Sequence, residues 1–136
     1  MTSAHILLAH GSRDPEWGAA IEAVAARIRR IDPAARVGCA YLEGAPPDLL
    51  TALDALLAGN EQDAEHTPVS TIRVWPMFLG LGRHARADLP RLIGDAQQHL
   101  RARHPGVALA LEPTIAEHAP VLDAMALVIL HKASNF

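Results

Sequence analysis

Short apolar segments alternate with longer amphipathic segments four times along this chain of 136 residues. The apolar segments are predicted strands at 5–9, 36–42, 71–77 and 107–111, and the amphipathic segments are predicted helices at 15–30, 48–58, 85–103 and 120–132. Such an alternation favours a parallel sheet with right-handed crossover helices on its faces. Four units are too few for an eightfold barrel. We therefore predict an α/β fold: an open, mainly parallel, flavodoxin-like four-stranded sheet in order 2-1-3-4, with helices on both faces.

Local signals set the expected ends of these helices. Asp14 before Pro15 has the pattern of a helix N-cap followed by the first helical residue. Asp48 opens the second helix after two prolines, and Gly59 ends it. The polar, aperiodic segment 60–70 is predicted to be a long loop at the sheet edge opposite the ligand crevice.

Composition bounds the class of protein. The length fits one domain spanning 1–136, and a net charge of -3 offers no basic field for nucleic acid. The longest apolar stretch, 124–130, is far below the roughly 20 residues of a membrane helix, and the first residues lack the basic region of a signal peptide. The single cysteine, Cys39, is expected to be a buried, inert thiol. We expect a cytoplasmic protein without membrane contact.

Three chemically active side chains follow the first three predicted strands. His10 follows the first strand, Glu43 follows the second, and His84 follows the third. Ligands of open α/β sheets bind outside the carboxyl ends of the strands, at the switch point between strands one and three. Two imidazoles and a carboxylate suit a divalent transition metal such as Fe, Co or Ni. The alternative is that these are ordinary surface histidines and a solvated glutamate.

Neighbouring residues support a ligand site at this edge. Gly11, Gly80 and Gly82 leave room for a flat ligand near the backbone and permit positive φ. Asp88 lies one turn after His84, where it is placed to orient the imidazole.

Three arginines lie on the same two predicted loops. Arg13, Arg83 and Arg86 would pair well with a ligand that carries several carboxylates. Ser12 lacks the Gly-x-Ser-x-Gly pattern of a nucleophile elbow, which favours a turn or capping role for its hydroxyl.

The remaining histidines show weaker signals. His118 begins the last helix at the ligand-facing edge and is a candidate for the border of the site. His131 and Lys132 lie in the last turn of that helix, where cations complement the helix dipole. We expect the others to face solvent; they are His5, His66, His99 and His104.

Four segments carry a resemblance to a known family. They are LLAHGSRDP at 7–15, AYLEGAPPDLLTAL at 40–53, VWPMFLGLGRHARADLPRLI at 74–93 and, more loosely, HPGVALALEPTIAEHAPVL at 104–122. The chain resembles the small, single-domain sirohydrochlorin chelatases, the cobaltochelatase and ferrochelatase group of class II chelatases. The resemblance implies a chelatase-like fold and insertion of Co²⁺, Fe²⁺ or Ni²⁺ into a reduced tetrapyrrole, feeding cobalamin or sirohaem synthesis.

The resemblance also implies roles for particular residues. The two metal-site histidines of the family fall on His10 and His84, and an acidic position used in related chelatases falls on Glu43. Residues expected to contact the tetrapyrrole are Ser12, Arg13, Gly80, Gly82, Arg83 and Arg86. Arg83 stands where glycine is common, which affects access or carboxylate contacts.

Assembly and cofactors follow from the same resemblance. Longer members resemble two fused copies of this domain, so a homodimer with a shared cleft is expected. The metal is a substrate, and no organic cofactor is expected. The alternatives are a non-catalytic metal or tetrapyrrole carrier and, less favoured, a hydrolase that uses His10 and Ser12.

Overall fold

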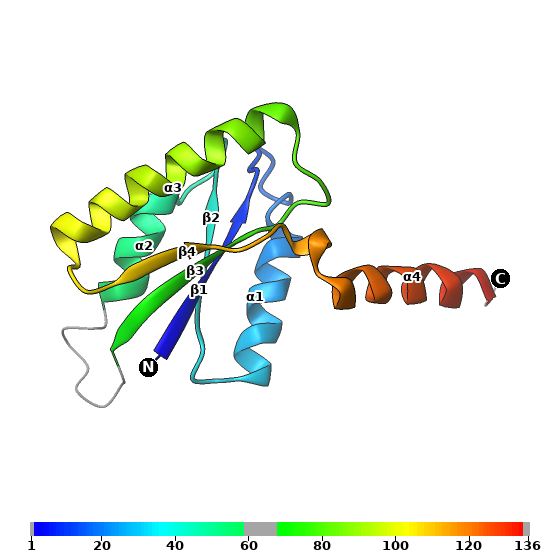
Figure 1. Ribbon diagram of the computed structural model, residues 1–136. Coiled ribbons are helices and arrows are strands. Elements are labelled where there is room, and N and C mark those ends of the chain that lie inside the picture. Colours follow the sequence, from blue (N-terminus) through cyan, green and yellow to red (C-terminus); the bar gives the residue numbers. More distant parts are fainter. Residues whose placement is uncertain (1, 59–67, 135–136) are drawn as a thin grey trace.

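The computed structural model describes residues 2–58 and 68–134, and its strands and helices alternate as predicted (Figure 1). The strands are β1 (Thr2–Ala9), β2 (Arg36–Tyr41), β3 (Val69–Pro76) and β4 (Ala108–Leu111). The helices are α1 (Ala19–Ile31), α2 (Leu49–Leu57), α3 (Arg83–Arg103) and α4 (Ala119–Ser134), with a short 3₁₀ helix, η2 (Ile115–Glu117), before α4.

The sheet has the predicted topology. Its order is β2-β1-β3-β4 and every neighbouring pair is parallel. In the centre of the sheet, Leu7 is level with Cys39 of β2 and Trp75 of β3. The predicted α/β class and strand order are therefore confirmed, and the switch point lies between β1 and β3.

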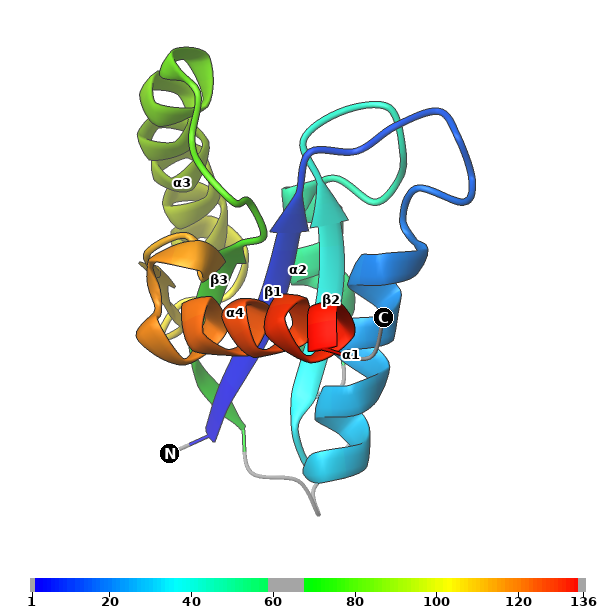
Figure 2. The ribbon, with the colours of Figure 1, turned by 90° about the vertical axis from the view of Figure 1, so that its right-hand side faces the viewer.

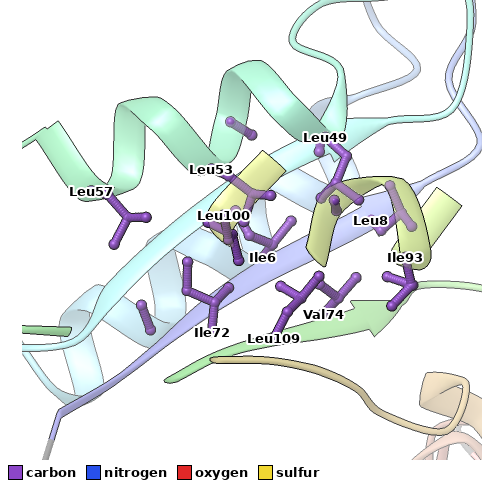
Figure 3. Close-up of a cluster of buried hydrophobic side chains, with 14 of the residues drawn as sticks. Ile6, Leu8, Leu49, Leu53, Leu57, Ile72, Val74, Ile93, Leu100 and Leu109 are labelled. Carbon is purple, nitrogen blue, oxygen red and sulfur yellow. The ribbon is translucent and has the colours of Figure 1, made fainter. Parts of the chain in front are cut away.

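The main core lies between the sheet and the helices α2 and α3 (Figure 3). Side chains of a strand point alternately to opposite faces, so Ile6 and Leu8 of β1 enter this core while Leu7 faces α1. The largest fully buried side chains of this core are Ile6, Leu8, Leu49, Leu53, Leu57, Ile72, Val74 and Leu100. Their burial fixes the face of each strand that packs against α2 and α3. Parallel pairing of the strands sets the edge at which their carboxyl ends meet.

The opposite face of the sheet is covered differently. Helix α1 packs there against Leu7, Val37 and Cys39. Cys39 is buried as predicted, and burial together with the neighbouring Glu22 raises the pKa of its thiol to about 11. Helix α4 extends away from the sheet (Figure 1). Among the described residues, no helix has the length and apolarity to span a bilayer.

Two helix starts differ from the prediction. Helix α1 begins at Ala19 with Gly18 as N-cap, so the prediction of Asp14 as the N-cap is wrong. The Asp14 carboxylate instead accepts a hydrogen bond from the N–H of Glu16 at 3.0 Å, closing a turn. Helix α3 begins two residues before the predicted Ala85, because its N-cap is Gly82.

The Asp48 N-cap of α2 is confirmed, since its side chain accepts a hydrogen bond from the N–H of Thr51 at 2.9 Å. The predicted loop 60–70 lies mostly outside the described residues, and its last residues, from Val69, belong to β3.

Two histidines that we predicted to face solvent instead connect two helices. The Nε2 atoms of His99 and His104 lie 2.9 and 3.0 Å from the same carboxylate oxygen of Asp54 on α2. Burial alone would raise the pKa of Asp54, but the hydrogen bonds from the two imidazoles outweigh it and lower that pKa. Hydrogen bonding therefore joins the end of α3 to α2. His66 lies outside the described residues.

A third histidine predicted to face solvent is half-buried on the α1 side of the sheet. The indole Nε1–H of Trp75 donates a hydrogen bond of 3.1 Å to Nδ1 of His5. Burial, assisted by the charge of Arg73, lowers the pKa of His5. The neutral imidazole is the form that accepts this bond.

Candidate functional site at the carboxyl edge of the sheet

The loops after the first three strands meet at one edge of the sheet. Backbone hydrogen bonds extend the pairing of β1 and β2 beyond the ends of these strands. The N–H of Leu42 donates to the carbonyl of Ala9 at 2.9 Å, and the N–H of Glu43 donates to the carbonyl of His10 at 3.0 Å. On the other side of β1, Met77 N–H donates to Leu8 at 2.8 Å. Figure 2 shows the loops after β1 (blue) and β2 (cyan) at the same end of the sheet as the start of α3 (green). This is the edge at which open α/β sheets bind ligands.

Two glycines hold the loops after β1 and β2 together. Gly11 has φ of 94°, and a Cβ built on it would lie 1.7 Å from the carbonyl oxygen of Glu43. Gly44 has φ of 76° and faces the backbone of Ser12 at about 3.0 Å from an added Cβ. The prediction that Gly11 leaves room for a ligand is therefore wrong, because the backbone of Glu43 fills that room.

Gly80 and Gly82 behave differently from Gly11. Both have open space where a Cβ would stand, as expected for room beside the backbone. Neither uses the positive φ that glycine permits. Gly82 has extended backbone as the N-cap of α3, which sets the start of that helix.

The loop packing places an imidazole beside a carboxylate. His10 Nδ1 lies 3.6 Å from Glu43 Oε1, and the two side chains are 60% and 72% exposed. The rings of His10 and Phe78 pack edge to face, with their centroids 6.2 Å apart. The loop after β3, which carries Phe78, therefore also contacts the His10–Glu43 pair. An exposed imidazole next to a carboxylate can bind a divalent metal or accept a proton.

His10 and Glu43 form one wall of a cleft of about 500 Å³, and helix α3 forms the other. The lining residues are His10, Leu42, Glu43, Ala85, Asp88, Leu89, Arg91, Leu92 and Asp95. Arg91 and Asp95 were not predicted from the sequence. Their spacing from Asp88, three and seven residues along the helix, is the signal that would have found them, because such residues share one helix face.

His84 is the second residue of α3, at the same edge of the sheet, but its side chain lies outside what the structure describes. Asp88, predicted to orient that imidazole, pairs with Arg91 at 2.9 Å on the exposed surface of α3. Among the described side chains, which exclude that of His84, no three His, Cys, Asp or Glu groups gather closely enough to hold a metal ion.

The predicted arginines do not gather in this cleft. Arg13 and Ser12 line a second depression of about 400 Å³ between the loops after β1 and β2 and the start of α1. The Ser12 hydroxyl accepts a hydrogen bond from the N–H of Asp14 at 3.1 Å, as predicted for a turn residue. Arg83 and Arg86 lie exposed on the first turn of α3.

His118 lies away from the His10 cleft. Its ring is 5.5 Å from that of Trp75, on the α1 side of the sheet. It caps the end of η2 and has an imidazole Nε2 3.3 Å from the carbonyl of Pro113. The structure thus places it beside the sheet face rather than at the ligand edge.

An open parallel sheet with a histidine–carboxylate pair in the loops after two neighbouring strands defines an α/β protein with a ligand site at the carboxyl ends of its strands. Comparison with known proteins makes this class specific. The CbiX family model matches residues 4–130, so the chain belongs to the CbiX family.

Individual relatives agree with this assignment. The chain is 31% identical over 112 residues to a sirohydrochlorin cobaltochelatase of Saccharolobus solfataricus, covering 82% of this chain and 78% of that protein. A crystal structure of a CbiX protein of cobalamin (vitamin B12) biosynthesis from Marinobacter aquaeolei superposes with a TM-score of 0.74 and 28% identity, covering 99% and 98% of the two chains. The cobalt complex of the sirohydrochlorin chelatase SirB from Bacillus subtilis superposes with a TM-score of 0.58 and 25% identity, over 85% of this chain and 44% of SirB.

Proposed function

We propose that this protein is a chelatase that inserts a divalent metal ion into sirohydrochlorin or a related reduced tetrapyrrole. The observation that carries the proposal is the His10–Glu43 pair, 3.6 Å apart and exposed at the mouth of a cleft, in a chain of the CbiX family. Relatives named as a cobaltochelatase and as a chelatase in complex with cobalt support the same reaction.

The chemistry of insertion matches these side chains. The ion must lose water, enter the macrocycle from one face, and replace two protons on pyrrole nitrogens. An imidazole binds such an ion reversibly and accepts protons near neutral pH, which are the roles we assign to His10 and, from its place in α3, to His84. We assign Glu43 the role of a further metal ligand. Asp88, one turn after His84 on α3, is proposed to orient the His84 imidazole.

The exposure of the pair fits a planar substrate. The ring of the tetrapyrrole has to approach the metal-bearing side chains directly, and both His10 and Glu43 are more than half exposed. The apolar residues Leu42, Leu89 and Leu92 give the cleft a surface against which a flat macrocycle packs.

Cations near the cleft would hold the peripheral carboxylates of the tetrapyrrole. We propose this role for Arg83 and Arg86 on the first turn of α3 and for Arg13 in the neighbouring depression. Ser12, Gly80 and Gly82 are proposed to contact the substrate through the same loops. Arg86→Gln is expected to raise KM for sirohydrochlorin several-fold, whereas Arg101→Gln at the far end of α3 leaves KM unchanged.

Cobalt is the metal that the relatives favour, and cobalamin synthesis is the corresponding pathway. The ligand types also suit iron and nickel, and with iron the corresponding pathway is sirohaem synthesis. We also propose a homodimer, since SirB is more than twice as long as the segment that this chain matches.

The deciding experiment is anaerobic insertion of Co²⁺, Fe²⁺ and Ni²⁺ into sirohydrochlorin, followed by absorbance. The wild type should accelerate insertion of at least one ion. His10→Ala and His84→Ala should each lose at least about 100-fold of that acceleration. The sequence places His66 before β3, so His66→Ala is the matched control and should keep the wild-type rate.

Two results would contradict the proposal. Equal rates for the wild type and both histidine variants would exclude His10 and His84 from the reaction. Tight binding of metal or tetrapyrrole without turnover would identify a carrier instead.

A further inference from the structure

The wall of the His10 cleft that α3 provides is divided lengthwise into an apolar strip and a polar strip. Successive residues of a helix point about 100° apart, so the lining residues of α3 fall into two neighbouring rows along its length. The apolar strip consists of Ala85, Leu89 and Leu92, and the polar strip consists of Asp88, Arg91 and Asp95. A ligand that fills the cleft therefore meets both strips.

The apolar strip lies deeper than the polar strip. Leu89 is buried at 3% exposure, and Leu92 is partly buried against the main core. The side chains of Asp88 and Arg91 are 64% and 75% exposed, so they stand at the rim of the cleft. A flat ring that packs its face on the apolar strip therefore brings its edge to the polar strip.

The charges around the cleft are mostly carboxylates. Asp88 and Asp95 flank Arg91 on the α3 wall, and Glu43 stands on the opposite wall. Arg91 is the one arginine or lysine among the described residues that line the cleft. Carboxylates on a ligand are repelled by carboxylates of the protein and attracted by the guanidinium. Arg91 is therefore the place in the cleft where an anionic group of a ligand is favoured.

The ion pair with Asp88 leaves most of the Arg91 guanidinium available. Arg91 Nη2 donates a hydrogen bond of 2.9 Å to Asp88 Oδ1. A guanidinium has five N–H donors in a planar fork, and Asp88 takes one bond from it. In the described part of the chain, Arg91 has no further hydrogen-bond or ion-pair partner. The rest of the fork can bind a second carboxylate through two parallel bonds.

The other arginines of this region stand outside the cleft. Arg83 and Arg86 lie on the first turn of α3 but do not line the cleft, and Arg13 lines the second depression. They can reach carboxylates only where the substrate extends beyond the cleft. Arg91 is placed to contact the edge of a ring held between α3 and the His10–Glu43 pair.

We propose that Arg91 binds a peripheral carboxylate of the tetrapyrrole at the rim of the His10 cleft. The contact makes the cleft selective for macrocycles that carry free carboxylates at their edge, because an apolar wall alone does not distinguish flat rings by their charge. This inference rests on the proposed chelatase function. It adds a residue that neither the sequence pattern nor the named relatives assign to the substrate.

Binding of metal-free sirohydrochlorin, followed by quenching of tryptophan fluorescence at low ionic strength, tests the contact without the insertion reaction. Arg91→Gln should raise the Kd about 10-fold, because the cation and its fork are lost. Arg91→Lys keeps the charge and loses the fork, so its Kd should lie between those of the wild type and Arg91→Gln. The difference between the wild type and Arg91→Gln should shrink in about 1 M salt.

The matched control is Arg101→Gln. Arg101 lies near the far end of the same helix and outside the cleft, so its loss removes the same charge without the contact and should leave the Kd unchanged. Circular dichroism of each variant establishes that the fold is retained. In the insertion assay, Arg91→Gln should raise KM with little change in kcat, because the carboxylate lies away from the pyrrole nitrogens.

The double variant Asp88→Asn/Arg91→Gln separates a direct contact from charge neutralisation. If Arg91 acted only by neutralising Asp88, removal of both charges would restore the wild-type Kd. A direct contact predicts that Arg91→Gln still raises the Kd several-fold when it is compared with Asp88→Asn alone. The comparison within the Asp88→Asn background therefore decides between the two.

The remaining outcomes distinguish this contact from the chelatase function. A wild-type Kd in Arg91→Gln, or its recovery in the double variant, would overturn the contact and leave the chelatase function in place. A wild type that binds sirohydrochlorin but inserts none of the three ions would overturn the chelatase function alone, and weaker binding by Arg91→Gln would still support the contact. A wild type without affinity for sirohydrochlorin would contradict both.

Discussion

The α-carbon of Gly11 faces the carbonyl oxygen of Glu43 so closely that an added Cβ would lie 1.7 Å from it. This contact joins the loops after β1 and β2, and the neighbouring Glu43 N–H donates to the carbonyl of His10 at 3.0 Å. The imidazole and the carboxylate of the candidate site are therefore brought together by packing of backbone on backbone.

Gly11→Ala is expected to destabilise the protein strongly. The substitution introduces a clash with the Glu43 backbone and a non-glycine residue at φ of 94°. We expect the free energy of unfolding, measured in urea, to fall by at least about 2 kcal/mol. Gly80→Ala, with open space at its Cβ position, should change it by less than about 0.5 kcal/mol. Equal stabilities for the two variants would contradict the packing role of Gly11.

Glu43→Gln tests the carboxylate of the candidate site. The amide keeps the shape of the side chain but removes the charge beside His10 Nδ1. If Glu43 holds the metal or orients the imidazole, Co²⁺ insertion should slow by about 10- to 100-fold. Glu16→Gln, in the exposed turn before α1, is the control. Wild-type rates in both variants would remove Glu43 from the site.

Asp54→Asn should weaken the link between α2 and α3. The Asp54 pKa is lowered, so the ionised carboxylate stabilises the folded state above the unfolded value near 3.8, and that stabilisation is lost as the pH falls through the lowered pKa. Because this side chain is partly exposed, we expect a loss of only about 1 kcal/mol at pH 7.

Urea unfolding of Asp54→Asn and the wild type at pH 7, 5 and 3 measures this effect. The difference between the two proteins should persist at pH 5 and shrink below about pH 3.8. Asp95→Asn, at another carboxylate on the side of α3, provides the reference. A difference that stays constant down to pH 3 would contradict a charge-dependent link.

His5 should titrate below the ordinary histidine value of 6.5. Burial and the charge of Arg73 lower the pKa of His5, and the hydrogen bond from Trp75 requires the neutral ring. Stability from this group is present above pH 6.5 and is lost as the pH falls through the lowered pKa. A histidine-ring NMR titration measures the midpoint, and His5→Gln identifies the resonance. A midpoint at or above 6.5 would refute the prediction.

Much of the fold could be predicted because its information is local. The alternation of apolar and amphipathic segments indicated the parallel sheet and its order, and Asp48 marked the start of α2. The turn at Asp14 was missed because the same carboxylate can cap either a helix or a turn, and only the path of the chain decides between them.

The candidate site was partly predictable for the same reason. His10 and Glu43 follow strands, and parallel strands end at one edge, so their proximity could be expected. Arg91 and Asp95 enter the cleft only because α3 begins at Arg83 and turns that face toward the loops. The roles of His84 and Asp88 remain predictions for the insertion assay.

By itself, the sequence determined the α/β class, the strand order and the edge at which His10 and Glu43 meet, because hydrophobic periodicity sets the elements and parallel pairing sets their ends. Tertiary structure alone decided the contact of Gly11 with Glu43, the bridging of His99 and His104 by Asp54, and the outward direction of α4. Those features join residues distant in sequence or depend on the direction in which an element leaves the sheet. A local sequence pattern predicts neither such contacts nor such directions.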